Sequence, residues 1–429
     1  MPEINPFLGY IYNTKKIKDI SKVLAPPYDV ISSEIQDSLY KRSEFNIIRL
    51  ILGKDKTGDN KTNNRYKRAK AFLDEIIAKD ILTKDKKPSL YLYGQEYTGA
   101  GEKRQRLGFI SLMKLEDRKN SSILPHERTF AKPRKDRSKL IHNINANDSP
   151  IFSIFEDRKN VVTDILDRES KKKPVFDVNF EGVRERLWRV SDSKIISHIA
   201  AELKNKQVFI ADGHHRYEVA LNYRDEMRKR HKKIPAVAPY DYIMMYFVGL
   251  DDSRLTILPT HRVVKNIGNL KNEVILSLLE EYFDIKKFKD FNNMYLVQKN
   301  QGGKFTFGMY CGNGFYLLKL KDTANLSDLI KGEMSNEWKA LDVTVLHKLL
   351  LERVLKVKDK EGNIAYYRSA SDAIEKVKND GYKLALFLNP TRLEEVKDIA
   401  LKGEKMPHKS TYFYPKLLTG VVINKFNGV

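Results

Sequence analysis

The stretch QVFIADGHHRYEVALNYRDEM, residues 207–227, decides the fold around it. Its first residues, QVFI, form an apolar run that is typical of a buried strand. The pair Asp212-Gly213 then predicts a tight turn, and apolar residues recur at helical spacing from Tyr217 onward. The stretch therefore predicts a strand, a turn and a helix in direct succession.

The first turn of this predicted helix carries His214, His215 and Arg216. Backbone N–H groups at a helix N-terminus have no partner within the helix, and they bear the positive end of its dipole. Together with these side chains they suit an anionic oxygen, above all that of a phosphate. The structural alternative is that Asp212 caps the helix and that the histidines are surface residues. We favour the phosphate site because three such side chains directly follow a strand and a turn.

Length and composition indicate a folded enzyme of two or three domains. The chain has 429 residues, of which 41 % are hydrophobic and 10 % aromatic. No apolar run approaches the length of a membrane span, and the first residues, MPEIN, lack the pattern of a signal peptide. The single cysteine, Cys311, excludes an internal disulfide framework and a cysteine-based metal cluster. We expect a cytoplasmic protein without a membrane partner.

The formal net charge of +22 raises the question of nucleic-acid binding. The lysines, however, are spread along the whole chain and usually have Asp or Glu nearby, as in VLKVKDKEGN. The chain has no arginine-rich arm and no zinc-finger spacing. Dispersed charge of this kind is typical of solvated surfaces, so we do not expect direct nucleic-acid binding.

The sequence pattern divides the chain into three regions and predicts an α+β fold. Residues 1–116 mix predicted strands and helices. Residues 117–265 hold most of the polar chemistry, and within them residues 156–206 are charged and weakly patterned, which predicts an insertion. Residues 266–429 again mix both kinds of element, with a helix expected at 342–357.

A second group of polar residues lies in the segment ILPHERTFAKPRKDRSKLI. Glu127 stands between a histidine and an arginine in a loop that contains proline, which is a suitable setting for a general base. The cations that could neutralise phosphate charge beside it are His126, Arg128, Lys132 and Arg137. A salt-bridged loop is the structural alternative. A zinc-protease HExxH motif is excluded because Phe130 occupies the place of its second histidine.

Two further segments could contribute anion contacts. LPTHR places His261 and Arg262 after an apolar run, so they could bind an anion at a strand end or lie in an ordinary loop. MPHKST places Lys409, Ser410 and Thr411 between a predicted helix and an aromatic strand. A lysine, hydroxyls and turn N–H groups suit a phosphate, although the same residues also make good turns and caps.

Several of these segments resemble the hallmarks of a widespread bacterial and archaeal family of unknown function. They are APPYDVI, PHERT, ADGHHRYEVAL, LPTHR, LDVTVLH and MPHKSTYFYPKLLTG, and they run from Ala25 to Gly420. A more distant resemblance, carried by LPHE, SPIF and DGHHR, is to the ParB/sulfiredoxin superfamily and in particular to its free-serine kinases. It implies an α+β fold with a ParB/sulfiredoxin-like core between family-specific regions.

The resemblance to free-serine kinases also implies a reaction. Glu127 matches their base toward the serine hydroxyl, and Asp212, Gly213, His214, His215 and Arg216 match their phosphate loop. The two histidines and the arginine would spread the charge of the transferred phosphoryl group. The implied substrates are ATP or ADP with serine or phosphoserine, and Mg²⁺ is expected with the nucleotide, without a metal site made by the protein alone.

Both directions of transfer remain open, and transfer from phosphoserine to ADP would serve serine biosynthesis. Three alternatives also remain open. The chain could be a nucleotide-gated, DNA-associated binding protein of the ParB type, a phosphatase or nuclease that uses water as acceptor, or a ligand sensor without catalytic activity. Nothing in the sequence indicates the oligomeric state.

Overall fold

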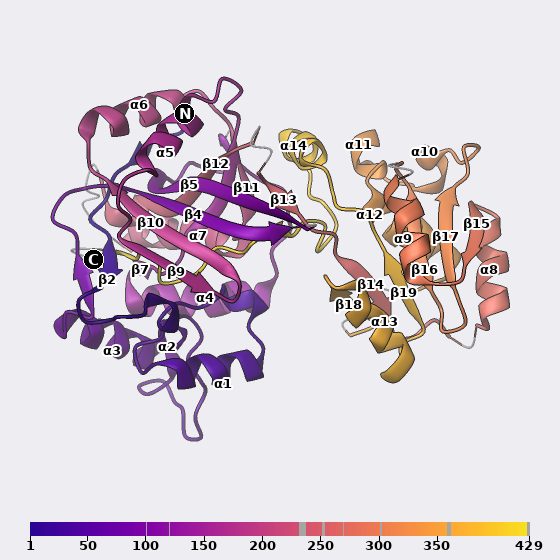
Figure 1. Ribbon diagram of the computed structural model, residues 1–429, viewed down its shortest axis with the longest axis horizontal. Coiled ribbons are helices and arrows are strands. Elements are labelled where there is room, and N and C mark those ends of the chain that lie inside the picture. The colour runs from indigo at the N-terminus through magenta and orange to yellow at the C-terminus, as the bar shows by residue number, and fades with distance from the viewer. Residues whose placement is uncertain are drawn as a thin grey trace. The chain divides into compact units, whose positions relative to one another are not determined.

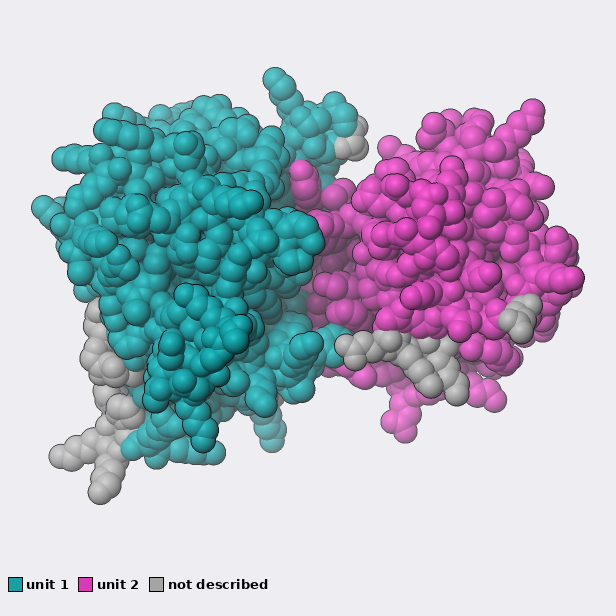
Figure 2. Space-filling model, turned by 90° about the horizontal axis from the view of Figure 1, so that it is seen from below, with its two compact units in different colours: residues 1–125, 129–256, 415–429 teal, residues 126–128, 257–414 magenta. Residues whose placement is uncertain are grey.

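The computed structural model describes residues 1–99, 101–119, 121–230, 237–250, 254–268, 270–300, 303–357 and 362–426. The chain divides into two compact units (Figures 1 and 2). Unit 1 comprises residues 1–125, 129–256 and 415–429, and unit 2 comprises residues 126–128 and 257–414. The chain passes into unit 2 within β13 (Thr256–Ile257) and returns to unit 1 after β20 (Phe413–Tyr414).

The centre of unit 1 is a mixed sheet, in which Figure 1 shows β4, β5 and β10 side by side. Two neighbouring pairs, β6 with β11 and β8 with β12, are parallel, and the other described pairs are antiparallel. The strand order is β6 (Ile123–Pro125), β11 (Val208–Asp212), β8 (Ile151–Phe155), β12 (Tyr242–Gly249), β5 (Glu102–Lys114), β4 (Leu90–Gly99), β10 (Val183–Val190) and β9 (Phe176–Phe180), with β1 (Ile4–Asn5) also paired to β5.

Helices of unit 1 begin where the sequence offers caps. The side chains of Ser32, Asn64 and Asp192 each accept a hydrogen bond from a first-turn N–H. The helices are α1 (Ser33–Arg42), α2 (Ile48–Ile51), α3 (Arg65–Ala78), α4 (Ala131–Ile144), α5 (Val161–Glu169), α6 (Ser193–Leu203) and α7 (His214–Arg230), with short 3-10 turns at Ile20–Lys22, Tyr28–Val30 and Pro239–Asp241. From α5, α6 and α7, Ile165, Ile199 and Ala220 join the core of the sheet.

The last residues of the described chain, 415–426, form a strap that is built into unit 1. Backbone hydrogen bonds join Thr419 to Ala25 and Ile423 to Tyr10 in both directions. The strand β21 (Asn424–Lys425) of this segment pairs with β7 (Ala146–Asn147). The strand β2 (Tyr10–Tyr12), which holds Tyr10, also pairs with β3 (Leu82–Lys84). We call residues 415–426 the C-terminal strap.

The observed division differs from the three regions expected from the sequence. Residues 1–116 and 117–265 share one sheet, because β4 and β5 pair with strands of the later region. Residues 156–206, which we expected to be an insertion, supply β10 and β9 at one end of that sheet. The C-terminal strap, moreover, leaves the third region to join the first.

A buried polar network holds the start of the C-terminal strap. Arg106 donates to the carbonyl of Pro415, and Gln95 Nε2 donates to the carbonyl of Lys416 at 3.0 Å. Glu185 accepts from Tyr93 Oη at 2.6 Å and from Gln95 Nε2 at 3.1 Å. Glu185 is 1 % exposed, and this burial raises its pKa to about 7. The backbone of the strap is therefore fixed by side chains from β4, β5 and β10.

Unit 2 is an antiparallel sheet with helices on both faces. The strand order is β15 (Phe283–Phe288), β17 (Phe315–Leu320), β16 (Thr306–Tyr310), β19 (Leu384–Phe387), β14 (His261–Val264) and β18 (Ile364–Tyr367). One core cluster joins α8 (Asn272–Glu280) to the sheet, and the other joins α9 (Phe291–Asn300) and α13 (Ala370–Asn379). The remaining helices are α10 (Leu326–Leu329), α11 (Asn336–Lys339), α12 (Asp342–Thr344) and α14 (Leu393–Leu401).

The helix expected at 342–357 begins as α12 and continues as a π-helix, Val345–Val354, which packs into the first cluster. The class of the whole chain is α+β, as the sequence predicted. Among the described residues, no helix is long and apolar enough to cross a membrane.

The buried carboxyl of Glu185 predicts a pH-dependent stability. Because its pKa is about 7 in the folded chain and 4.5 in the reference state, the folded chain binds more protons between these values, and stability falls as the pH rises through that window. The contribution is ~3 kcal/mol. Glu185→Gln should remove this dependence. When the free energy of unfolding of both proteins is measured with urea from pH 4.5 to above pH 7, it should fall with rising pH more steeply for the unaltered protein than for the variant. Parallel curves would show that Glu185 does not titrate in this way.

Candidate functional site

Residues 212–216 form the strand–turn–helix junction that the sequence predicts, and we call them the phosphate turn. Gly213 has φ +95°, and its carbonyl accepts from the N–H of Tyr217 at 3.0 Å, which closes the first turn of α7. A Cβ at Gly213 would lie 2.9 Å from Nη2 of Arg216. Glycine is thus required twice, by the left-handed backbone and by the guanidinium folded over it.

The carboxylate of Asp212 is shared between two cations. Lys416 Nζ, from the C-terminal strap, donates to Oδ1 at 2.7 Å, and Arg216 Nη2 donates to Oδ2 at 3.5 Å. Two cations and one carboxylate leave surplus positive charge at the N-terminus of a 17-residue helix. Since the helix dipole has the same sign there, the phosphate turn is electrostatically suited to an anion.

Arg216 is held from its inner side as well. Its Nη1 donates to Ser149 Oγ at 2.9 Å and to the carbonyl of Pro150 at 2.7 Å. Its Nε is buried and has no hydrogen-bond partner among the described residues. The side chain is 11 % exposed. The guanidinium is therefore fixed in place before any ligand binds.

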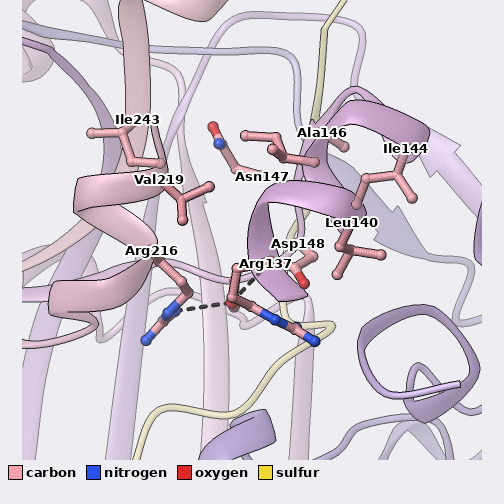
Figure 3. A pocket seen from close by; sticks show the side chains of 11 residues that line it. Arg137, Leu140, Ile144, Ala146, Asn147, Asp148, Arg216, Val219 and Ile243 are labelled. Carbon is pink, nitrogen blue, oxygen red and sulfur yellow. Dashed lines mark hydrogen bonds between the residues drawn. The ribbon is translucent and has the colours of Figure 1, made fainter. Parts of the chain in front are cut away.

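Arg137 and Arg216 line a small cavity beside the first turn of α7, and Figure 3 shows both guanidinium groups at one end of it. The cavity measures about 30 Å³, which holds about two water molecules. Its walls are mostly apolar, with Leu140, Val219 and Ile243 among them. A nucleotide or an amino acid would therefore bind outside this cavity.

Arg137 itself is paired within unit 1. It is 6 % exposed, donates through Nε to Asp136 at 2.8 Å, and lies with Cζ 4.1 Å from the ring centre of Tyr28. Burial raises the pKa of Tyr28 to about 12. Lys132, by contrast, is exposed on the first turn of α4. Of these two expected anion contacts, Lys132 is open to solvent and Arg137 supports the interior.

The tautomer of His215 follows from its contact with α4. Its Nε2 lies 2.9 Å from the backbone N–H of Phe130, which donates to it. A ring nitrogen that accepts a hydrogen bond carries no proton, so the imidazole is neutral and bears its hydrogen on Nδ1. The neighbouring His214 is 5 % exposed. In this tautomer, the nitrogen of His215 that can donate a hydrogen bond is Nδ1.

Helices α4 and α7 lie side by side in the same direction. Phe130, which precedes α4, meets His215 at the start of α7, and near the other end His142 Nε2 lies 2.8 Å from Glu226 Oε2. The two N-termini therefore adjoin, so the positive ends of both dipoles act on the same volume.

In unit 2, the structure brings together His126, Glu127 and Thr411. Met406 N–H donates to the carbonyl of His126 at 2.8 Å, and Glu127 forms a parallel bridge with Met406. His126 is fully buried, and its Nε2 lies 3.1 Å from Thr411 Oγ1. Glu127 is half-buried and Arg128 is exposed.

Arg262 has a structural environment rather than that of the expected anion contact. It is 1 % exposed, and its Nε donates to His347 Nε2 at 3.2 Å. Its other nitrogens donate to the carbonyls of Thr260, His408 and Lys409, the last at 3.0 Å. The guanidinium thus holds the loop that carries Lys409. Because protein carbonyls occupy these donors, an anion would have to displace them.

The other residues expected to bind anions in unit 2 are mostly buried. Burial, together with the charge of Arg262, lowers the pKa of His261 to about 4, so this ring is neutral at neutral pH. Ser410 is 4 % exposed and donates to the carbonyl of Pro407 at 2.6 Å, and Thr411 is 9 % exposed. Lys409 has φ +55°. The Ser410 hydroxyl therefore stabilises the turn, while the Thr411 hydroxyl pairs with His126.

Three polar groups at the phosphate turn were not expected from the sequence, namely Lys416, Ser149 and Tyr28. Lys416 lies 204 positions from its partner Asp212, and no local pattern relates the two. The one signal was its place in the hallmark MPHKSTYFYPKLLTG. Across the described ranges, no group of three or more His, Cys, Asp or Glu side chains could hold a metal ion.

Comparison with solved structures gives distant likenesses. A conserved hypothetical protein from Pyrococcus furiosus is 14 % identical, with 72 % of this chain and 92 % of that chain covered and a TM-score of 0.35. A free serine kinase in complex with AMP is 16 % identical, with 71 % and 86 % covered and a TM-score of 0.35. SbnI with a C-terminal truncation, from Staphylococcus aureus, is 12 % identical, with 72 % and 85 % covered and a TM-score of 0.35.

No curated protein matches this sequence. The profile of the family described as "Protein of unknown function (DUF1015)" matches residues 4–344, which is more than half of the chain. The chain therefore belongs to the DUF1015 family.

Proposed function

We propose that this protein transfers a phosphoryl group between an adenine nucleotide and serine or phosphoserine, with a ParB/sulfiredoxin-like core in unit 1. The observation that carries the proposal is the phosphate turn. There, Arg216 and Lys416 share one carboxylate at the N-terminus of α7, so positive charge is in excess. A phosphate oxygen would be drawn to these cations and to the first-turn N–H groups.

The nucleotide phosphates would bind in place of the contacts to Asp212. Lys416 and Arg216 would turn from that carboxylate to phosphate oxygens, while Ser149 and the Pro150 carbonyl keep the other side of the guanidinium fixed. His215 would donate through Nδ1, since Phe130 occupies its Nε2. Because neighbouring groups already order these side chains, they would exchange one ionic partner for another with little loss of conformational freedom.

Glu127 is the proposed base toward the serine hydroxyl. Pro125 and Ile210 are partners in the parallel pair of β6 and β11. Glu127 follows Pro125 by two residues, just as Asp212 follows Ile210 by two residues. Glu127 and Asp212 thus each follow the carboxyl end of one of two neighbouring parallel strands, and ligands of α/β sheets bind beyond such ends, which supports the role of base for Glu127.

The proposed step forms one bond between oxygen and phosphorus and breaks another. The serine hydroxyl oxygen bonds to the γ-phosphorus of ATP, the bond from that phosphorus to the β-phosphate oxygen breaks, and the hydroxyl proton passes to Glu127. In reverse, an ADP oxygen bonds to the phosphorus of phosphoserine, the bond from that phosphorus to the serine oxygen breaks, and Glu127 returns the proton to that oxygen. Magnesium would arrive with the nucleotide and be held by its phosphate oxygens, because no group of three or more His, Cys, Asp or Glu side chains among the described residues could hold a metal ion.

A phosphorus NMR assay of the pure protein tests this proposal. The protein is incubated with Mg²⁺ and either serine with ATP or phosphoserine with ADP. We expect transfer in at least one pair, and the relative rates would indicate the favoured direction. Release of free phosphate without nucleotide would instead identify a phosphatase, and no change in either pair would overturn the proposal.

Replacement of the proposed base should separate turnover from binding. Glu127→Gln removes the negative charge of a half-buried side chain and keeps its size. We expect the turnover measured by NMR to be lost, while nucleotide affinity in calorimetry stays within a few-fold, because Glu127 is not assigned to the phosphates. Retained turnover with loss of nucleotide binding would contradict the assignment.

Replacement of Lys416 should weaken the nucleotide. Lys416→Met removes one charge of the phosphate turn, and a hydrogen bond to a charged group contributes ~1.5–3 kcal/mol, so affinity for ADP should fall about ten-fold or more. Lys425→Met removes the same charge from the same C-terminal strap, where Lys425 Nζ lies 3.7 Å from Asp74 Oδ1, and should leave ADP affinity unchanged. Equal effects of both variants in calorimetry would show that only net charge matters.

A further inference from the structure

Phe130 is an aromatic side chain exposed beside the phosphate turn. It is 46 % exposed, and the other exposed large hydrophobic side chains of the described residues are aliphatic. Burying a phenylalanine stabilises a fold by ~1.5–3 kcal/mol, which this position forgoes in large part. A single exposed hydrophobic residue is ordinary on a protein surface, so exposure alone would not identify a function.

What distinguishes Phe130 is that both its backbone and its ring are fixed by His215. Its N–H donates to His215 Nε2 at 2.9 Å. Its ring stacks on the imidazole, with centroids 6.2 Å apart and planes inclined by 27°. The preceding residue, Thr129, is held as well, because its Oγ1 accepts a hydrogen bond from Arg134 at 2.9 Å. An exposed flat side chain held in this way has little freedom to lose when it binds a ligand.

The ring also lies at the point where two helix N-termini adjoin. Phe130 immediately precedes α4, and His215 is on the first turn of α7. An anion in the phosphate turn would therefore have His215 beside it and the Phe130 ring one imidazole further away. A nucleotide matches this arrangement, since its anionic phosphates are joined through a ribose to a flat aromatic base. Exposed Lys132, two residues after Phe130 in the first turn of α4, adds a cation to the same helix N-terminus.

We propose that Phe130 is the platform on which the base of the bound nucleotide stacks. This inference rests on the proposed function, because it assigns the base of the nucleotide whose phosphates the phosphate turn would bind. Stacking on an aromatic ring contributes ~1–3 kcal/mol per base and does not read the hydrogen-bonding edge of the base. The platform therefore accepts purine nucleotides by their flat faces, and ADP and GDP bind with similar affinity.

Calorimetry with ADP, GDP and inorganic pyrophosphate tests this role, because pyrophosphate has the phosphates without the base. In Phe130→Ala, affinity for ADP and GDP should fall about thirty-fold, the middle of the range for one stacked base, while affinity for pyrophosphate stays within two-fold. Phe130→Trp, which keeps an aromatic ring, should bind ADP and GDP about as tightly as the unaltered protein. Ile35→Ala is the matched control, since Ile35 is an aliphatic side chain of unit 1 that is 38 % exposed, and it should change none of the affinities.

Two outcomes overturn the platform while leaving the proposed function in place. Either Phe130→Ala binds ADP as tightly as the unaltered protein, or it loses ADP and pyrophosphate equally, which would mean that Phe130 acts only through His215. If the unaltered protein binds neither ADP nor pyrophosphate, the proposed function falls and the platform falls with it. Melting curves of each variant show that the fold is retained.

Discussion

Asp212 lies between two cations, with Lys416 Nζ 2.7 Å from one carboxylate oxygen and Arg216 Nη2 3.5 Å from the other. These three residues come from β11, the C-terminal strap and α7. Because the side chains of Lys416 and Arg216 are each only 11 % exposed, solvent screens these contacts little. Without the carboxylate, two largely buried cations would face each other, which is costly. The turn, the helix and the strap are therefore coupled through this one side chain.

The same coupling orders the side chains of the phosphate turn that the proposed function assigns to phosphate binding. Arg106 and Gln95 hold the backbone carbonyls of Pro415 and Lys416, so the lysine is carried on a rigid support. Ser149 and the Pro150 carbonyl do the same for Arg216. A phosphate would find its donors already oriented, and it would exchange one set of ionic contacts for another instead of ordering flexible side chains. Preorganisation of this kind lowers the free-energy cost of binding.

Sequence reasoning succeeded where the signal is local. The strand, the turn and the helix at residues 207–230 follow from apolar periodicity and from a glycine with positive φ, and both are properties of neighbouring residues. Sequence reasoning was less informative where the role of a residue depends on whether its side chain is buried. The pattern LPTHR is the same whether Arg262 faces solvent or, as found, donates to His347 and to carbonyls of the loop near Lys409. Those partners lie far away in the sequence, so no local pattern indicates them.

The return of the chain to unit 1 escaped prediction for the same reason. The C-terminal strap pairs with Ala25, Tyr10 and β7, and these contacts become visible only in three dimensions. Lys416, which completes the phosphate turn, was therefore missed, although Arg216 and both histidines of that turn were identified. Local motifs thus located the turn, and its charge balance depends on a residue that the fold brings from the far end of the chain.

A crystal structure of the protein with ADP and Mg²⁺ tests the central claim most directly. The account predicts that a phosphate lies against the backbone N–H groups of residues 214–216, with Arg216 and Lys416 turned from Asp212 toward its oxygens. ADP bound elsewhere, with the contacts of Asp212 to both cations intact, would contradict it.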